Sequence, residues 1–188
     1  MCQYFSCIVT KDLKAHWNKK TMNHDELRTE VGLEDKTVVE REYVKIEISP
    51  KDPEKVTRNR DDWKLRLDEE RTLPTWYEKN VLKCQKSCWT AWEESVQINI
   101  AIEKEEKEGS DQLFFAYDSS KVVAYDSSKV EAYGSSKVVA YGSSKVEAHG
   151  SSKVEIKSDY AVVLCHKKIF VSEKTIVVKA SIVKASEV

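Results

Sequence analysis

One eight-residue motif is repeated five times between Ala116 and Glu155, and this repeat constrains the fold more than any other feature of the chain. A fixed short period is typical of stacked, quasi-one-dimensional architectures, in which each repeat packs only on its neighbours. The copies read AYDSSKVV, AYDSSKVE, AYGSSKVV, AYGSSKVE and AHGSSKVE, and they begin at Ala116, Ala124, Ala132, Ala140 and Ala148.

The spacing of apolar residues continues beyond these copies. One column is mostly valine, and a second column two residues later is mostly alanine. We therefore predict one continuous unit from Leu113 to Val188, with both columns facing inward. The first column is Val122, Val130, Val138, Val146, Val154, Val162, Phe170 and Val178, and the second is Ala124, Ala132, Ala140, Ala148, Ile156, Leu164, Ser172, Ala180 and Val188.

A period of eight with inward residues two apart indicates strands, because side chains alternate between the faces of a strand. Each octad supplies a strand of about five residues and a corner of Asp or Gly followed by two serines, residues that suit tight turns. Stacked coils of this kind form a β-solenoid. The variable position reads Val123, Glu131, Val139 and Glu147. This sixteen-residue alternation favours two octads per coil, with the valines on one outer face and the glutamates on the other; a triangular coil of three octads is the alternative.

The preceding residues have the mixed pattern of a small α+β domain. The predicted fold is therefore an α+β head over residues 1–110 and a C-terminal β-solenoid of about ten octapeptide strands, two per coil, over residues 111–188. The glutamate-rich run 103–108 is expected to be a helix end or connector. The elements expected in the head are a hairpin of residues 4–10 and 13–17, a helix from the N-cap Asn23 to Gly32, strands over 37–48 and 63–67, and a helix that Thr75 and Glu78 cap.

Composition limits the function classes. Charged residues make up 34% of the chain but give a formal net charge of -1, which argues against a strongly basic nucleic-acid clamp. The five cysteines contain no Cys-x-x-Cys pair, as expected for free thiols in a reducing cytoplasm. No apolar run reaches the length of a membrane span and no signal-peptide core is present, so we expect a cytoplasmic protein without a membrane partner. No catalytic or metal-binding motif is found, so we expect no enzyme activity, cofactor or metal.

Three groups of residues are candidates for partner binding. Outward tyrosines could stack on a ligand, although aromatic ladders also stabilise neighbouring strands. Repeated lysines could follow a phosphate backbone, although Glu131, Glu147 and Glu155 lie two residues beyond Lys129, Lys145 and Lys153. Aromatic residues of the head could form an interface or fill its core. The candidates are Tyr117, Tyr125, Tyr133, Tyr141, Lys121, Lys129, Lys137, Lys145, Trp63, Trp76 and Tyr77.

The C-terminal segment from Thr175 to Val188 is apolar and rich in strand formers. An unpaired strand edge is a template for further pairing, so we expect this end to pair with a second copy and form a homodimer. The residues expected at this contact are Ile176, Val178, Ile182 and Val183.

The octads, with their Ala-aromatic-Gly/Asp-Ser-x-x-Val pattern, resemble repeats in uncharacterised proteins of bacteriophages and gut-bacterial mobile elements. The segments CIVTKDLKAHW, VKIEISP and DWKLRLDEERTLPTWYE are similar to the domain that precedes such repeats. The resemblance implies a non-enzymatic interaction protein in the bacterial host cytoplasm that binds a host protein or ribonucleoprotein. It suggests an inhibitor of bacterial defence, similar in role to anti-CRISPR proteins. The first alternative is a nucleic-acid-binding module that uses the tyrosine and lysine columns. An enzyme whose site lies in the head domain and a structural role in the virion are two further alternatives.

Overall fold

The chain forms two compact units that divide between Ile98 and Asn99. The computed structural model describes residues 4–34, 41–52, 55–68, 72–158, 160–165 and 177–179. We call the first unit the head and the second the solenoid. This division precedes the expected boundary at residue 110, because the strands β5 (Ile100–Ala101) and β6 (Glu106–Ser110) belong to the sheets of the solenoid.

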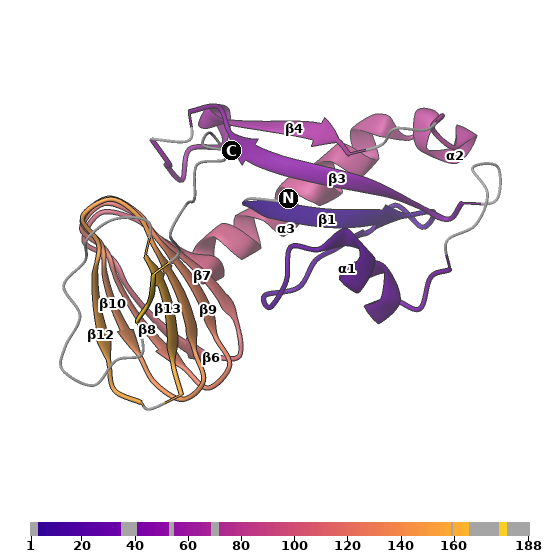
Figure 1. The fold of residues 1–188 in the computed structure, drawn as a ribbon. Coiled ribbons are helices and arrows are strands. Elements are labelled where there is room, and N and C mark those ends of the chain that lie inside the picture. The colour runs from indigo at the N-terminus through magenta and orange to yellow at the C-terminus, as the bar shows by residue number, and fades with distance from the viewer. Residues whose placement is uncertain are drawn as a thin grey trace, which may run out of the picture. The chain divides into compact units, whose positions relative to one another are not determined.

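The head contains an antiparallel sheet in the order β2-β1-β3-β4 (Figure 1). Its first two strands form the N-terminal hairpin that the sequence predicts. The strand predicted over 63–67 is β4, with the same bounds. The strand predicted over 37–48 corresponds to β3, which ends two residues later; residues 37–40 lie outside the described part. The bounds are β1 Phe5–Thr10, β2 Ala15–His16, β3 Tyr43–Pro50 and β4 Trp63–Leu67.

The helix α1 (His24–Glu30) has both of the ends that the sequence predicts. The Asn23 side chain accepts hydrogen bonds from the backbone N–H groups of Asp25 and Glu26, which satisfies donors of the first turn. Gly32 follows the helix with a φ of 74°, and its N–H and that of Leu33 donate to carbonyls of the last turn. This is the Schellman arrangement, in which a left-handed glycine closes the helix.

The second predicted helix is divided into α2 (Thr75–Glu78) and α3 (Val81–Asn99). Thr75 is the first helical residue instead of the cap, and Pro74 precedes it without a side-chain cap bond, so the predicted capping box is wrong. The interruption between α2 and α3 has a local cause. The Asn80 side-chain amide donates to the Trp76 carbonyl at 2.8 Å, and the Asn80 carbonyl accepts the first backbone bond of α3. A short 3-10 helix, η1 (Arg60–Asp62), precedes β4.

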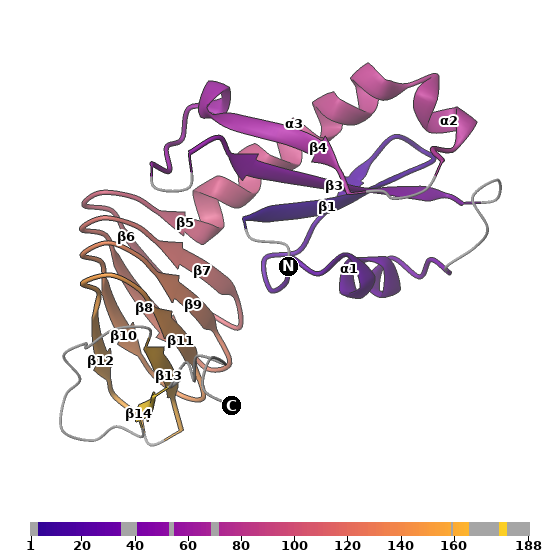
Figure 2. The same ribbon diagram turned by 45° about the horizontal axis from the view of Figure 1, so that its top comes forward.

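The head has a core on each face of its sheet, as the two views of the ribbon illustrate (Figures 1 and 2). On one face α1 packs Leu27 against Ile8 and Tyr43. On the other face α3 packs Trp92 against Trp63, with ring centroids 5.1 Å apart. Among the described residues, no helix is long and apolar enough to cross a membrane.

The solenoid consists of two parallel sheets, in the orders β12-β10-β8-β6 and β14-β13-β11-β9-β7-β5, and makes about four turns (Figure 2). Val138 pairs with Val122 and Val154, each sixteen residues away. The predicted coil of two octads is therefore correct and the triangular alternative is excluded. The strand bounds are β7 Leu113–Ala116, β8 Lys121–Tyr125, β9 Lys129–Ala132, β10 Lys137–Ala140, β11 Lys145–Ala148, β12 Lys153–Ile156, β13 Val162–Cys165 and β14 Val177–Lys179. The glutamate-rich run is thus partly strand β6, and not a helix end.

The interior of the solenoid is one continuous cluster of mainly valine and alanine side chains, and its members from Val122 to Val154 are all buried. Corners join the strands, and their first residues have positive φ, as expected for Asp and Gly at these positions. The second serine of each corner is buried, and the hydroxyls of Ser128, Ser144 and Ser152 donate to backbone carbonyls; Ser144, for example, donates to the Tyr141 carbonyl at 2.6 Å. The corner residues with positive φ are Asp118, Asp126, Gly134, Gly142 and Gly150.

The inward pattern changes register between β12 and β13. Lys145 pairs with Val162, seventeen residues later, whereas Lys129 pairs with Lys145 after sixteen. Val163 is consequently buried, while Val162 and Leu164 are 38% and 39% exposed. The prediction that Val162 and Leu164 face inward is wrong, because one extra residue in the corner before β13 reverses the direction of the side chains at these positions.

A steric conflict explains the extra residue. Strict sixteen-residue spacing would put Tyr160 at the position where each earlier corner buries its second serine. A close-packed site for a serine cannot hold a tyrosine ring. The small residue Ala161 is buried in this position instead, and Tyr160 is 78% exposed.

The predicted dimer contact falls mostly outside the described residues. Ile176, Ile182 and Val183 lie outside them. Val178 belongs to β14, which pairs in parallel with β13 in the same chain. The homodimer therefore stays a prediction.

Candidate functional site

The outer tyrosines form two stacked columns, one on each sheet, as the octad spacing predicts. Tyr117, Tyr133 and His149 stack with centroid separations of 5.1 Å and 4.7 Å. Tyr125 and Tyr141 stack at 5.0 Å on the other sheet. Within each column the face of one ring packs on the face of the next, and Tyr117, at one end of its column, is buried. Only ring edges and the remaining column ends are therefore open to a partner.

We call the outer surface of β7, β9, β11 and β13 the glutamate face, because Glu131 and Glu147 are paired in its centre. The Tyr133 hydroxyl donates to the Glu131 carboxylate at 2.8 Å, and His149 Nε2 lies 3.4 Å from the Glu147 carboxylate. Burial raises the pKa of the Glu131 carboxyl; the bond from Tyr133 opposes this shift, and the nearby Glu147 charge adds to it.

A hollow of about 210 Å³ lies on the glutamate face. Charged side chains of β9 and β11 lie between apolar side chains of β7 and β13. The residues lining it are Leu113, Lys129, Val130, Glu131, Lys145, Val146, Glu147, Val162 and Leu164. Because the register shift exposes Val162 and Leu164 at one wall, this face combines apolar surface with charges of both signs.

The outer surface of β6, β8, β10 and β12 is the valine face, named for the paired Val123 and Val139. Lys121, Lys137 and Lys153 form a row in register along it. Acidic groups accompany this row: Lys121 Nζ lies 3.0 Å from Glu106. The predicted lysine candidates are thus split between two faces, with Lys121 and Lys137 here and Lys129 and Lys145 on the glutamate face.

The aromatic candidates of the head mainly build its core. Trp63 is buried and donates from its indole N–H to the Thr57 carbonyl at 2.8 Å. Tyr77 is also buried, and burial, followed by the neighbouring Cys84, Cys88 and Cys7, raises its pKa to about 12. These two side chains therefore cannot serve as partner-binding residues, because they are not at the surface.

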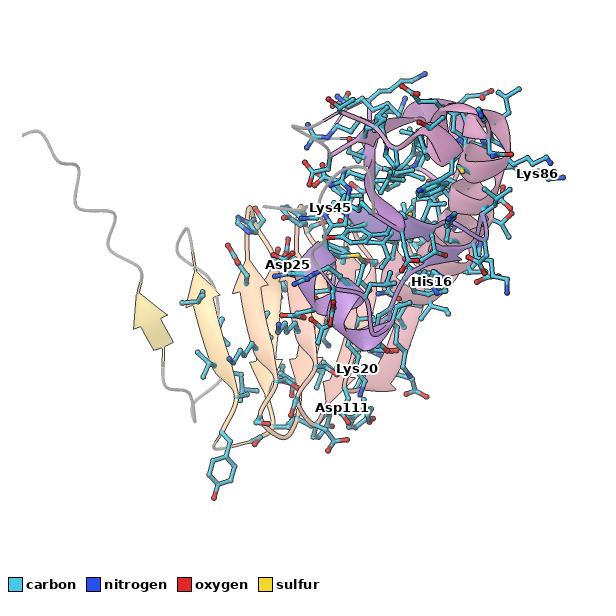
Figure 3. All side chains as sticks on the ribbon, turned by 90° about the vertical axis from the view of Figure 1, so that its right-hand side faces the viewer. His16, Lys20, Asp25, Lys45, Lys86 and Asp111 are labelled. Carbon is cyan, nitrogen blue, oxygen red and sulfur yellow. The ribbon has the colours of Figure 1, made fainter. Side chains whose placement is uncertain are left out.

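Trp76 differs from these two because it is only partly buried, and its indole N–H donates to the Arg41 carbonyl at 2.9 Å. A second hollow, of about 360 Å³, lies in the head between the hairpin and α3. It was not predicted, because its lining comes from distant segments without a shared motif. Its wall carries both charge signs, and Figure 3 shows Lys86 extending outward from α3. The lining residues are Ala15, Trp17, Lys83, Lys86, Ser87, Thr90, Ala91 and Glu94.

No protein family, curated protein or solved structure matches the chain.

Proposed function

We propose that this protein is a non-enzymatic interaction protein that binds a partner protein on the glutamate face of its solenoid. The observation that carries the proposal is the outward orientation of Val162 and Leu164 beside the 210 Å³ hollow. Exposed apolar surface next to a concave, partly charged region is typical of protein-binding sites.

The chemistry of the hollow suggests the kind of group that it accepts. Its volume exceeds the roughly 150 Å³ of a cavity that holds benzene, so one large apolar side chain fits. Lys145 and Glu147 lie beside the apolar wall and offer a positive and a negative group to the same partner segment. We therefore propose an apolar anchor residue of the partner, with charged or polar residues on both sides of it.

Loss of an anchor contact typically weakens binding by about 2 kcal/mol or more, which corresponds to roughly 30-fold in affinity. We expect Leu164→Asp to have this effect. Leu82→Asp is the matched control, since Leu82 is an 81% exposed leucine of α3 in the head. The same substitution there adds the same charge without touching the glutamate face.

The test compares the full-length protein, L164D and L82D as baits in lysates of bacterial hosts, followed by affinity measurement with the purified partner. The proposal expects a partner that the wild type and L82D retain and L164D loses. Equal retention by all three proteins, or loss with both variants, contradicts it.

The identity of the partner is a further part of the proposal. The resemblance of the octads to repeats of phage and mobile-element proteins supports a host protein or ribonucleoprotein, and inhibition of a bacterial defence system as the effect. Expression in a host that carries such a system should then restore phage plating, and L164D should not. Plating that is unchanged by the wild type in every defended host contradicts this part.

Nucleic-acid binding on the valine face is the second candidate, because Lys121, Lys137 and Lys153 lie in one row. The stacked Tyr125 and Tyr141 rings argue against base stacking there, since their faces contact each other. If the lysine row binds phosphates, affinity for single-stranded DNA falls steeply with salt and falls further on replacing these lysines by alanine. Lys129 and Lys145 lie on the glutamate face and serve as the control. If replacing them lowers the affinity equally, the binding depends on overall charge and not on the lysine row.

A further inference from the structure

Three side chains from separate segments of the head converge beside α1. His24 is the first residue of α1, Glu47 lies in β3, and Asp68 follows β4. One potential ligand atom from each lies within 4.8 Å of the others. None of the three belongs to a sequence motif, so the sequence did not indicate a site here.

The sheet register brings the two carboxylates to one face. Glu47 pairs with Arg66, and the Asp68 N–H donates to the Lys45 carbonyl at 3.0 Å, which extends the same ladder by two residues. Because side chains alternate along a strand, Glu47 and Asp68 point to the same side. The capped start of α1 holds His24 over this side.

The ring of His24 is oriented by the backbone. Its Nε2 lies 3.2 Å from the Ile46 carbonyl oxygen, which can only accept, so Nε2 carries the hydrogen. In the neutral ring Nδ1 then presents a lone pair toward Asp68 Oδ2, 3.3 Å away. A lone pair facing a carboxylate is repulsive unless a proton or a cation lies between them. An imidazole that donates its second nitrogen to a backbone carbonyl is the usual arrangement of a metal-bound histidine.

We propose that His24, Glu47 and Asp68 bind a divalent transition-metal cation of the zinc class. Zn²⁺ takes nitrogen and oxygen ligands at about 2.0–2.2 Å, so tetrahedral ligand atoms lie roughly 3.4 Å apart. The 3.3 Å between His24 Nδ1 and Asp68 Oδ2 already has this span, and a Glu47 carboxylate oxygen lies within 4.8 Å of a ligand atom of each of these residues. Three protein ligands leave the fourth position to water or to a partner's side chain.

Burial and charge agree with this assignment. His24 is 4% exposed and Glu47 is buried, while the Asp68 side chain is 44% exposed and provides the entry path. The Arg66 guanidinium donates from Nε to Glu47 at 2.7 Å and so fixes this carboxylate. Lys45 Nζ lies 3.5 Å from Asp25, and Figure 3 shows these two residues beside each other. The three ligands with Arg66 carry one net negative charge, and the imidazole favours zinc-class ions over Ca²⁺ and Mg²⁺.

The test uses full-length protein freed of metal by a chelator and titrated calorimetrically with Zn²⁺. We expect one site that Asp68→Asn and His24→Gln each weaken by about 100-fold or more, because replacing even an outer-shell partner typically costs 10- to 100-fold. Asp25→Asn is the matched control and should bind as the wild type does. Circular dichroism of each variant verifies folding.

The cysteines of the head could also hold zinc, so Co²⁺ serves as a second probe. Nitrogen and oxygen ligation gives no thiolate-to-cobalt charge-transfer band, and the His24 ring nitrogens should shift in NMR spectra of the wild type when Zn²⁺ is added. This NMR measurement is independent of any variant. Absence of Zn²⁺ binding, a thiolate band, an unshifted His24 ring, or unchanged affinity in D68N overturns the proposal and leaves His24 and Asp68 as an ion pair only.

Discussion

Replacing Gly142 with alanine tests how the corners of the solenoid stack. Gly142 has a φ of 61°, and a Cβ at this position would lie 2.8 Å from the Asp126 Cα of the preceding coil. The left-handed conformation costs a residue with a side chain about 1–2 kcal/mol. Overpacking against backbone that cannot rotate away costs a further 1–3 kcal/mol, roughly. We therefore expect Gly142→Ala to lower the free energy of unfolding of the solenoid by about 2–5 kcal/mol.

Gly32 provides the matched control. It has a φ of 74°, but a Cβ there would meet no atom within 4 Å, so Gly32→Ala carries the conformational cost alone. The difference between the two variants isolates the contact between coils. Gly32 belongs to the head and Gly142 to the solenoid, so the change in the free energy of unfolding is measured for the unit that contains each substitution.

The distribution of tryptophan makes this measurement direct. All five tryptophans, from Trp17 to Trp92, lie in the head, so their fluorescence in urea reports on this unit alone. Far-ultraviolet circular dichroism reports on both units. G142A should shift the circular-dichroism transition and leave the fluorescence transition in place, whereas G32A should shift the fluorescence transition. The stacking argument is wrong if G142A costs no more than G32A, or if its effect is confined to tryptophan fluorescence.

Three further predictions concern the register and two titrating groups. Val163→Asp should destabilise the solenoid by about 3 kcal/mol or more by burying an unpaired charge, whereas Leu164→Asp should change stability by less than about 0.5 kcal/mol in urea unfolding; equal effects would refute the register shift. The raised pKa of Glu131 means that the folded chain keeps this proton after the unfolded chain has released it, so stability falls as pH rises through that interval. Glu131→Gln should flatten this part of the stability curve, measured by thermal unfolding over pH, and an unaltered slope would contradict the assignment. The pKa of Tyr77, about 12 against an ordinary value of 10.0, predicts that the stability of the head falls between these pH values. Tyr77→Phe should remove this loss of stability and should remove one late-ionising group from the alkaline absorbance titration. A titration of the variant that still shows this group would contradict the assignment to Tyr77.

Much of the fold follows from local patterns in the sequence. The alternation of Val123 and Glu131 with Val139 and Glu147 was sufficient to predict a coil of two octads, because it reflects which positions share a face. The helix α1 was equally predictable, since Asn23 and Gly32 act on backbone groups of adjacent residues.

The errors arose where a local pattern competes with packing. Thr75 and Glu78 fit a capping box, but the Asn80 side chain ends the first turn and a new helix begins. The head tryptophans could belong to an interface or a core by sequence, and only burial decided that Trp63 is in the core.

The sequence by itself determined the repeat unit, the two-sided coil and the stacked tyrosines, because each depends on spacing within one regular structure. Tertiary structure alone decided the two candidate sites. Val162 and Leu164 face outward because Tyr160 does not fit the buried corner that Ala161 occupies, which is a steric fact about the preceding coil. Strand pairing and helix packing bring together segments that are far apart along the chain, and so place His24, Glu47 and Asp68 close to one another. No spacing of residues in the sequence predicts this cluster.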